Sequence, residues 1–183
     1  MSGQPSVEEL HWAPDPESMG ALGVRLGRVL RAGDLVILTG PLGAGKTTLT
    51  RGVGEGLGVR GPVQSPTFVL ARTHPSLVGG APLVHVDAYR LGGADELDDL
   101  DLDFEGSVVV AEWGAGIVEA RDDWLEVVIE RPLGGDGDDD GDDAAAADAD
   151  DPGDIDDWSE AIVEPRRITI TGYGPRWAEG VLK

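Results

Sequence analysis

Eight consecutive residues in the N-terminal half of the chain have the composition of a phosphate-binding loop. They are Gly40-Pro41-Leu42-Gly43-Ala44-Gly45-Lys46-Thr47 and match the pattern G-x-x-x-x-G-K-S/T in full. Glycines let the backbone wrap close to phosphate oxygens, and the N-terminus of a following helix adds its positive end. Lys46 would reach the β- and γ-phosphates, and Thr47 would bind Mg²⁺ through its hydroxyl, with Thr48 alongside. We therefore predict that ATP or GTP binds here with magnesium; a chance glycine-rich turn is the alternative.

Two acidic residues that end apolar runs could complete this site. Asp87 follows Leu83-Val84-His85-Val86, and Glu112 follows Val108-Val109-Val110-Ala111. Phosphoryl chemistry needs carboxylates to hold the metal and to orient the nucleophile. Ligands of α/β sheets bind at the carboxyl ends of parallel strands, where both acids fall. Either acid could act as the Walker B-like residue, and either could instead be a solvated strand end.

A possible switch segment, Ser65-Pro66-Thr67-Phe68, follows the loop and its predicted helix. P-loop switches place a segment that senses the γ-phosphate at this point of the chain. Thr67 could offer its hydroxyl to the metal or the phosphate, with Ser65 beside it. The alternative is an ordinary turn that enters a strand.

Further polar and aromatic residues surround the two acids. His85, Tyr89 and Arg90 flank Asp87, and we treat them as switch or interface candidates. A lone histidine inside a strand is more often structural than catalytic. Trp113 follows Glu112 and could be a core residue, a nucleotide-stacking residue or an interface residue.

The predicted elements that must position these residues alternate between helix and strand. Helical periodicity covers 16–32 with Gly33 as a stop signal, and a second helix covers 46–57 and ends at Gly58. Predicted strands cover 35–38, 68–71, 83–86, 108–111, 125–129 and 167–171, and a short helix covers 95–100. The last two strands have no helical pattern between them, so we expect an antiparallel pair at the edge. The fold predicted is a three-layer α/β P-loop NTPase with a mainly parallel central sheet.

The net charge of −21 is concentrated in one segment of the chain. Residues 134–160 contain 12 Asp and one Glu without Lys or Arg, so this tract carries −13 and the remaining residues carry −8. The tract has too few apolar residues to offset its ordering entropy. We expect a single domain over 1–183 with 134–160 as a disordered acidic insertion.

Composition also restricts where and with what the protein works. The chain has no cysteine, which excludes disulfides and cysteine metal sites and fits a reducing interior. Without an apolar run of ~20 residues or a signal peptide, we expect a cytoplasmic protein with no membrane segment. The acidic surface argues against direct binding of nucleic acid, which requires a basic footprint. Any role with RNA would therefore act through a partner.

Four motifs together carry a family resemblance. Gly-Pro-Leu-Gly-Ala-Gly-Lys-Thr-Thr, Ser-Pro-Thr-Phe, His-Val-Asp-Ala-Tyr-Arg and Ala-Glu-Trp occur in this order with short spacings. The set resembles the bacterial TsaE family, also called YjeE, over roughly Pro16 to Arg131. The resemblance implies a Mg²⁺-dependent ATPase that supports threonylcarbamoyladenosine (t6A) formation in tRNA. It implies TsaD and TsaB as the partners that carry out the transfer, with the ATP cycle resetting their complex.

Matched motif by motif, the resemblance also assigns roles to individual residues. It implies Thr47 and Glu112 as magnesium ligands, Asp87 as the catalytic or water-positioning acid, and Trp113 as a residue beside the metal site. Thr67 falls in the switch-like segment. Many members have Asp where this chain has Pro41, and the acidic insertion is not a hallmark of the family.

Two rival functions stay open from the sequence. A small-molecule kinase of this fold needs an arginine-bearing lid, and the chain has no Arg-rich segment after the third strand. A binding module could instead use ATP only as an assembly ligand. The chain lacks an Asn-Lys-x-Asp segment that reads guanine, which favours ATP. No arginine is clearly placed to act as an arginine finger, although Arg72 and Arg90 could do so, and we therefore expect slow hydrolysis without partners.

Overall fold

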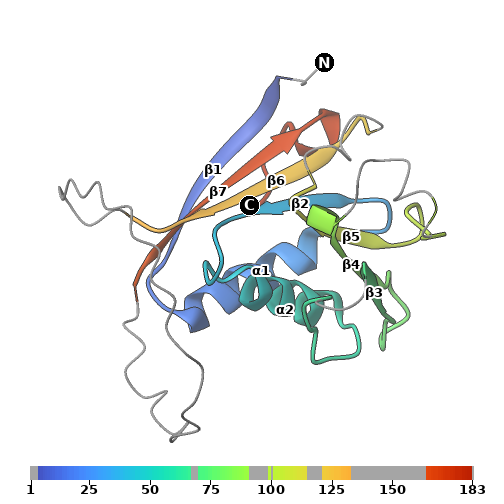
Figure 1. Ribbon diagram of the computed structural model, residues 1–183. Coiled ribbons are helices and arrows are strands. Elements are labelled where there is room, and N and C mark those ends of the chain that lie inside the picture. Colours follow the sequence, from blue (N-terminus) through green and yellow to red (C-terminus); the bar gives the residue numbers. More distant parts are fainter. Residues whose placement is uncertain are drawn as a thin grey trace, which may run out of the picture.

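A seven-stranded mixed sheet with strand order β1-β7-β6-β2-β5-β4-β3 organises the molecule (Figure 1). The computed structural model describes residues 4–66, 70–90, 99, 101–114, 121–132 and 164–182. The elements are β1 (Pro5–Ala13), α1 (Pro16–Val29), β2 (Leu35–Thr39), α2 (Lys46–Leu57), β3 (Ala71–His74), β4 (Leu83–Asp87), β5 (Val108–Glu112), β6 (Trp124–Glu130) and β7 (Arg166–Tyr173), with the short 3-10 turns η1 (Ala88–Arg90) and η3 (Pro175–Trp177).

The centre of the sheet is parallel and its flanks are antiparallel. Strands β6, β2, β5 and β4 run parallel to one another, and β3 is antiparallel to β4. The predicted antiparallel pair is confirmed as β6 and β7. A strand that was not predicted, β1, pairs antiparallel with β7 and takes the outer edge. The predicted mainly parallel α/β class is therefore correct, with antiparallel strands at both edges.

The two helices of the described residues both pack on one face of the sheet (Figure 1). Helix α1 begins where Asp15 Oδ1 accepts the Ser18 amide at 2.7 Å. It ends at Val29 instead of the predicted Ala32, because Leu30 is already extended and the Arg31 amide donates to Asp34 at 2.8 Å. Helix α2 has its predicted bounds and ends at Gly58 in the left-handed conformation. No helix in these described ranges is long and apolar enough to cross a bilayer.

Alternation along the central strands divides the core into two faces. Val36 and Leu38 of β2 point toward the helices, where Leu26 and Leu49 complete the larger cluster. Leu35 and Ile37 point to the opposite face, where the smaller cluster includes Val84, Val109, Ala111 and the partly buried Phe104 and Trp124. Burial on both faces explains why β2 and β5 are continuous apolar runs, as expected for parallel strands.

Glycines allow α1 and α2 to approach each other backbone to backbone. A Cβ added to Gly23 would collide with the Leu49 carbonyl oxygen and lie 2.9 Å from Gly52 Cα. A Cβ on Gly56 would lie 3.0 Å from Gly27 Cα, so the glycines of each helix face those of the other. The helix that follows the phosphate-binding loop is thus held at a separation that larger residues would not permit.

Several predicted elements differ from the structure or lie outside it. The strand predicted over 68–71 begins only at Ala71, because the antiparallel ladder with β4 covers Ala71–His74; residues 67–69 are not described. Of the predicted helix 95–100, only Asp99 is described, in a turn. The acidic segment 134–160 lies outside the described residues, so its prediction stays untested.

Candidate functional site

The loop between β2 and α2 has the backbone conformation that phosphate binding requires. Gly43 and Gly45 adopt φ values of +73° and +105°, which favour glycine. Gly40 lies against β6, since a Cβ there would be 3.0 Å from the Ile129 carbonyl oxygen. The loop borders a pocket of about 310 Å³, which is lined by Leu42, Gly43, Gly45, Lys46, Thr47, Thr48, Ser65 and Glu112. Five of the eight motif residues, Leu42, Gly43, Gly45, Lys46 and Thr47, thus line one opening.

The ammonium group of Lys46 lies at the mouth of this loop. Its Nζ donates to the carbonyl oxygens of Gly40 at 2.7 Å and Pro41 at 3.1 Å. It also lies 5.2 Å from the ring centroid of Trp113, within the range of a cation–π contact. The two carbonyl oxygens and the aromatic ring are weaker partners for a full positive charge than a phosphate oxygen is. Lys46 is therefore positioned to exchange them for an anion.

The parallel register of β4 and β5 places the two predicted acids side by side. Asp87 is paired with Glu112 at the carboxyl ends of these strands. Glu112 is 9% exposed and borders the pocket together with Lys46 and Thr47. Asp87 accepts the Tyr89 amide at 3.3 Å, which fixes it at the start of η1. Lys46, Thr47 and Glu112 thus line one pocket, whereas Asp87 lies beside Glu112 in the strand register and does not line it.

His85 lies two residues before Asp87 on β4 and is fully buried. Its Nε2 is 2.9 Å from Glu112 Oε1. Its Nδ1 has no hydrogen-bond partner among the residues that the structure describes. The sequence left its role open between a structural residue and a site residue, and the structure places it in contact with one of the acids.

Two exposed aromatic side chains lie next to the site. Trp113 has φ +61°, a value that is uncommon outside glycine, and its amide donates to the Leu38 carbonyl at 3.1 Å. Its ring meets Tyr89 edge-on at 6.4 Å between centroids. Trp113 is 44% exposed and Tyr89 is 77% exposed. Trp113 is therefore not a core residue, and nucleotide contact and partner contact stay as its possible roles.

The switch candidates are only partly described. Ser65 lines the pocket, which agrees with its predicted position after α2. Thr67 lies outside the described residues, so its proposed hydroxyl contact is untested. For Arg90 the structure gives only the backbone, which belongs to η1.

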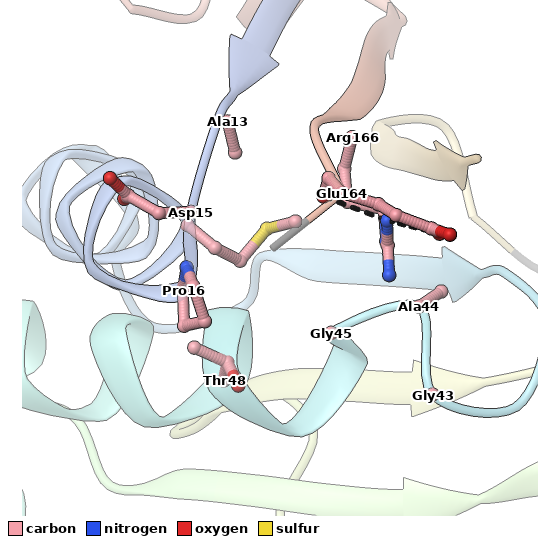
Figure 2. Close-up of a pocket in the computed structure, with 10 residues that line it drawn as sticks. Ala13, Asp15, Pro16, Gly43, Ala44, Gly45, Thr48, Glu164 and Arg166 are labelled. Atoms are coloured by element: carbon pink, nitrogen blue, oxygen red, sulfur yellow. Dashed lines mark hydrogen bonds and ion pairs between the residues drawn. The ribbon is translucent and has the colours of Figure 1, made fainter. Parts of the chain in front are cut away.

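A second pocket adjoins the first and was not predicted (Figure 2). Its volume is about 210 Å³, and it shares Gly43, Gly45 and Thr48 with the first pocket. Its other walls come from the start of α1, the end of β1 and the start of β7: Ala13, Asp15, Pro16, Met19, Glu164 and Arg166. The hydrogen bonds from Ser18 lower the pKa of Asp15 below its ordinary value. Three distant segments build this pocket, so no local pattern could reveal it.

Arg131 is a second residue that the sequence did not reveal. Its Nη2 is 3.4 Å from the Leu42 carbonyl oxygen, at the end of β6. The contact depends on β6 being the neighbour of β2, which the order of the elements does not dictate. Arg72, one of the two predicted finger candidates, instead donates to Gln64 at 3.0 Å.

The donor set fits a magnesium ion that arrives with a nucleotide. Among the described residues, no group of three or more His, Asp or Glu side chains could hold a metal ion alone. Mg²⁺ keeps several waters and binds through one or two protein ligands together with substrate phosphates. Thr47 and Glu112, which both line one pocket, would supply that number of ligands.

The fold and the site together define the class of P-loop nucleotide-binding proteins. Residues 13–133 match the family model described as "Threonylcarbamoyl adenosine biosynthesis protein TsaE". A Streptomyces coelicolor protein named tRNA threonylcarbamoyladenosine biosynthesis protein TsaE is 54% identical over 87% of this chain and 94% of its own length. A Mycobacterium tuberculosis protein of the same name is 52% identical over 64% of this chain and 76% of its own length.

A solved structure is similar to the chain over most of its length. The crystal structure of YdiB from Bacillus subtilis has a TM-score of 0.61 and 30% identity, and the match covers 93% of this chain and 88% of that one. The chain belongs to the TsaE family.

Proposed function

We propose that this protein hydrolyses ATP with Mg²⁺ and thereby supports t6A formation in tRNA, without itself transferring the threonylcarbamoyl group. The observation that carries the proposal is the convergence of Lys46, Thr47 and Glu112 on one pocket at the phosphate-binding loop. The names of the relatives at 52–54% identity support the link to t6A.

Each group has a defined part in the proposed hydrolysis. Lys46 leaves the carbonyls of Gly40 and Pro41 and binds the β- and γ-phosphates, while the loop amides stabilise the developing charge. Thr47 and Glu112 would hold Mg²⁺, which would supply positive charge to neutralise the phosphate oxygens. Asp87, next to Glu112 in the sheet, orients the attacking water.

The second pocket is suited to the base and ribose of the nucleotide. It continues from Gly45 and Thr48, on the side of the loop where α2 begins. Ala13, Pro16 and Met19 supply apolar wall surface, which suits a planar base. We assign the adenosine end of ATP to this pocket and the triphosphate to the first.

Charge and composition support a role through partners in the cytoplasm. A net charge of −21 opposes direct tRNA binding, so we infer that TsaD and TsaB bring the tRNA. Of the described arginines discussed above, Arg131 contacts a loop carbonyl and Arg72 contacts Gln64. Arg72, one of the two finger candidates, is thus engaged by Gln64, so we expect slow hydrolysis by the protein alone.

The test combines calorimetry, phosphate release and a reconstituted t6A assay with TsaD and TsaB. We expect Lys46→Ala to weaken Mg-ATP binding at least about tenfold, because the ammonium is the main charged phosphate ligand. Glu112→Ala should retain nucleotide binding in EDTA and lose hydrolysis. Arg25→Ala, on the exposed surface of α1, is the matched charge control and should resemble the wild type.

Three results would contradict the proposal. Equal nucleotide binding by the wild type and Lys46→Ala would remove the assigned site. A phosphorylated metabolite or nucleoside would identify a small-molecule kinase. Full t6A formation by a Glu112→Ala variant that does not hydrolyse ATP would identify an ATP-gated assembly module.

A further inference from the structure

The buried imidazole of His85 contacts one of the two acids of the site. We propose that His85 is a positioning residue that holds the carboxylate of Glu112 in the orientation needed for Mg-nucleotide binding. This inference rests on the proposed function, because it takes Glu112 as a ligand of the magnesium site.

The strand register brings His85 and Glu112 together on the helix-facing side of the sheet. His85 is paired with Val110 in the β4–β5 ladder, so Glu112 lies two residues further along the neighbouring strand. Val110 and Leu83 belong to the helix-facing core, and His85 shares their side because side chains alternate along a strand. The imidazole therefore contacts Glu112 from within the core, and Glu112 lines the pocket whereas His85 does not.

The contact with a carboxylate defines the role of Nε2. A carboxylate only accepts hydrogen bonds, so the Nε2 that lies 2.9 Å from Glu112 Oε1 must be the donor. With Oε1 held by His85, Oε2 is the oxygen left for a ligand in the pocket. A bond of this kind sets the rotation of the carboxylate, as outer partners do at many metal sites.

The other ring nitrogen provides no hydrogen bond that could hold the ring. Nδ1 has no hydrogen-bond partner among the described residues, although His85 is fully buried. An apolar side chain would avoid the cost of burying an unpaired nitrogen, as Val84 and Val86 do on the same strand. Among the described residues, the contact between Nε2 and Glu112 is therefore the hydrogen bond that orients the ring.

A nearby histidine provides the matched control. His74 on β3 is also buried, and its Nε2 also lacks a hydrogen-bond partner in the described part of the chain. Its partner in the ladder is Leu83, and it does not line the pocket. His74→Gln therefore tests the general cost of altering a buried imidazole on this side of the sheet.

The experiment compares His85→Gln, His85→Asn and His74→Gln. The amide nitrogen of Gln can occupy the place of Nε2, whereas the shorter Asn cannot reach Glu112. ATP hydrolysis is measured against Mg²⁺ concentration, and Mn²⁺ binding to the ADP complex is measured by EPR. We expect His85→Asn to weaken metal binding or activity by about 10–100-fold, and His85→Gln to recover most of it. In EDTA, the nucleotide affinity of both His85 variants should match that of the wild type. The metal dependence of His74→Gln should also match that of the wild type.

Distinct outcomes separate this inference from the proposed function. Absence of hydrolysis by the wild type would contradict the proposed function, while the Mn²⁺ measurement would still test His85. Equal losses in His85→Gln and His85→Asn, or a wild-type metal dependence in His85→Asn, would overturn the positioning role. If neither variant folds, ¹⁵N NMR of the wild-type imidazole decides: an Nε2–H tautomer whose Nε2 resonance moves when Mg-ADP binds supports the role. An unchanged resonance refutes it.

Discussion

Two glycines of α1, three residues apart, should respond to the same substitution with opposite signs. A Cβ at Gly20 would meet no atom within 4 Å, whereas a Cβ at Gly23 would meet the backbone of α2. The contact of 2.9 Å with Gly52 Cα must lengthen by about 0.6–1.1 Å to reach an ordinary carbon–carbon distance. We expect Gly20→Ala to stabilise the protein and Gly23→Ala to destabilise it.

The gain in helix propensity is the same in both variants, so the difference between their stabilities reports the packing cost alone. Replacing Gly by Ala inside a helix gains about 0.8–1.0 kcal/mol in either position. Overpacking at a well-packed contact costs about 1–3 kcal/mol, and it applies only to Gly23. The difference between the free energies of unfolding of the two variants therefore isolates the cost of separating the helices, about 1–3 kcal/mol.

Urea unfolding followed by circular dichroism measures this difference. For a chain of this size, 1 kcal/mol corresponds to about 2–4 °C in melting temperature, so thermal scans provide a second readout. Gly52→Ala, on the opposite helix, should resemble Gly23→Ala, since its Cβ would collide with the Gly20 carbonyl oxygen. Equal shifts for Gly20→Ala and Gly23→Ala, or stabilisation by both, would show that the close approach of the helices does not limit stability.

Two further predictions concern pH. Burial raises the pKa of Glu9, but the amides of Val181 and Leu182 outweigh it and hold this pKa below 4.5. Its stabilising effect is thus present above pH 4.5 and lost on acidification, so Glu9→Gln should cost about 1 kcal/mol in urea unfolding at pH 7 and much less at pH 3. Desolvation, with a contribution from the nearby His85, lowers the pKa of His74 below 6.5. Wild-type stability should therefore fall as pH drops below 6.5, and His74→Gln should flatten that dependence; identical slopes for the two proteins would refute it.

The sequence predicted the central strands and α2 because their apolar runs match what a doubly covered parallel sheet demands. It did not predict β1, where the usual pattern is reversed. Leu10 and Trp12 face solvent at 59% and 57% exposure, whereas Glu9 and His11 on the alternate face are less exposed. Glu9 faces inward because it accepts the amides of the C-terminal segment, a tertiary contact without a local signal.

The candidate site was predictable wherever local sequence determines geometry. The loop glycines and the strand-end acids follow from a motif and from the shared edge of parallel strands. The backbone of Trp113, the contact of Arg131 with the loop and the second pocket were not predictable. Each depends on which strands are neighbours in the sheet, and that order is settled only by the packing of the whole chain.

The outer part of the sheet sets physical limits on how this chain can be divided. Strand β7 and nearly all of β1 lie outside residues 13–133, the region that matches the family model. An expression fragment cut at those limits would leave the hydrogen-bonding edge of β6 bare, and Val127 and Ile129 would lose the cover of Ile168 and Ile170. A bare apolar edge is a template for intermolecular strand pairing and aggregation. Fragment boundaries for this protein should therefore be drawn from strand pairing and not from the extent of sequence similarity.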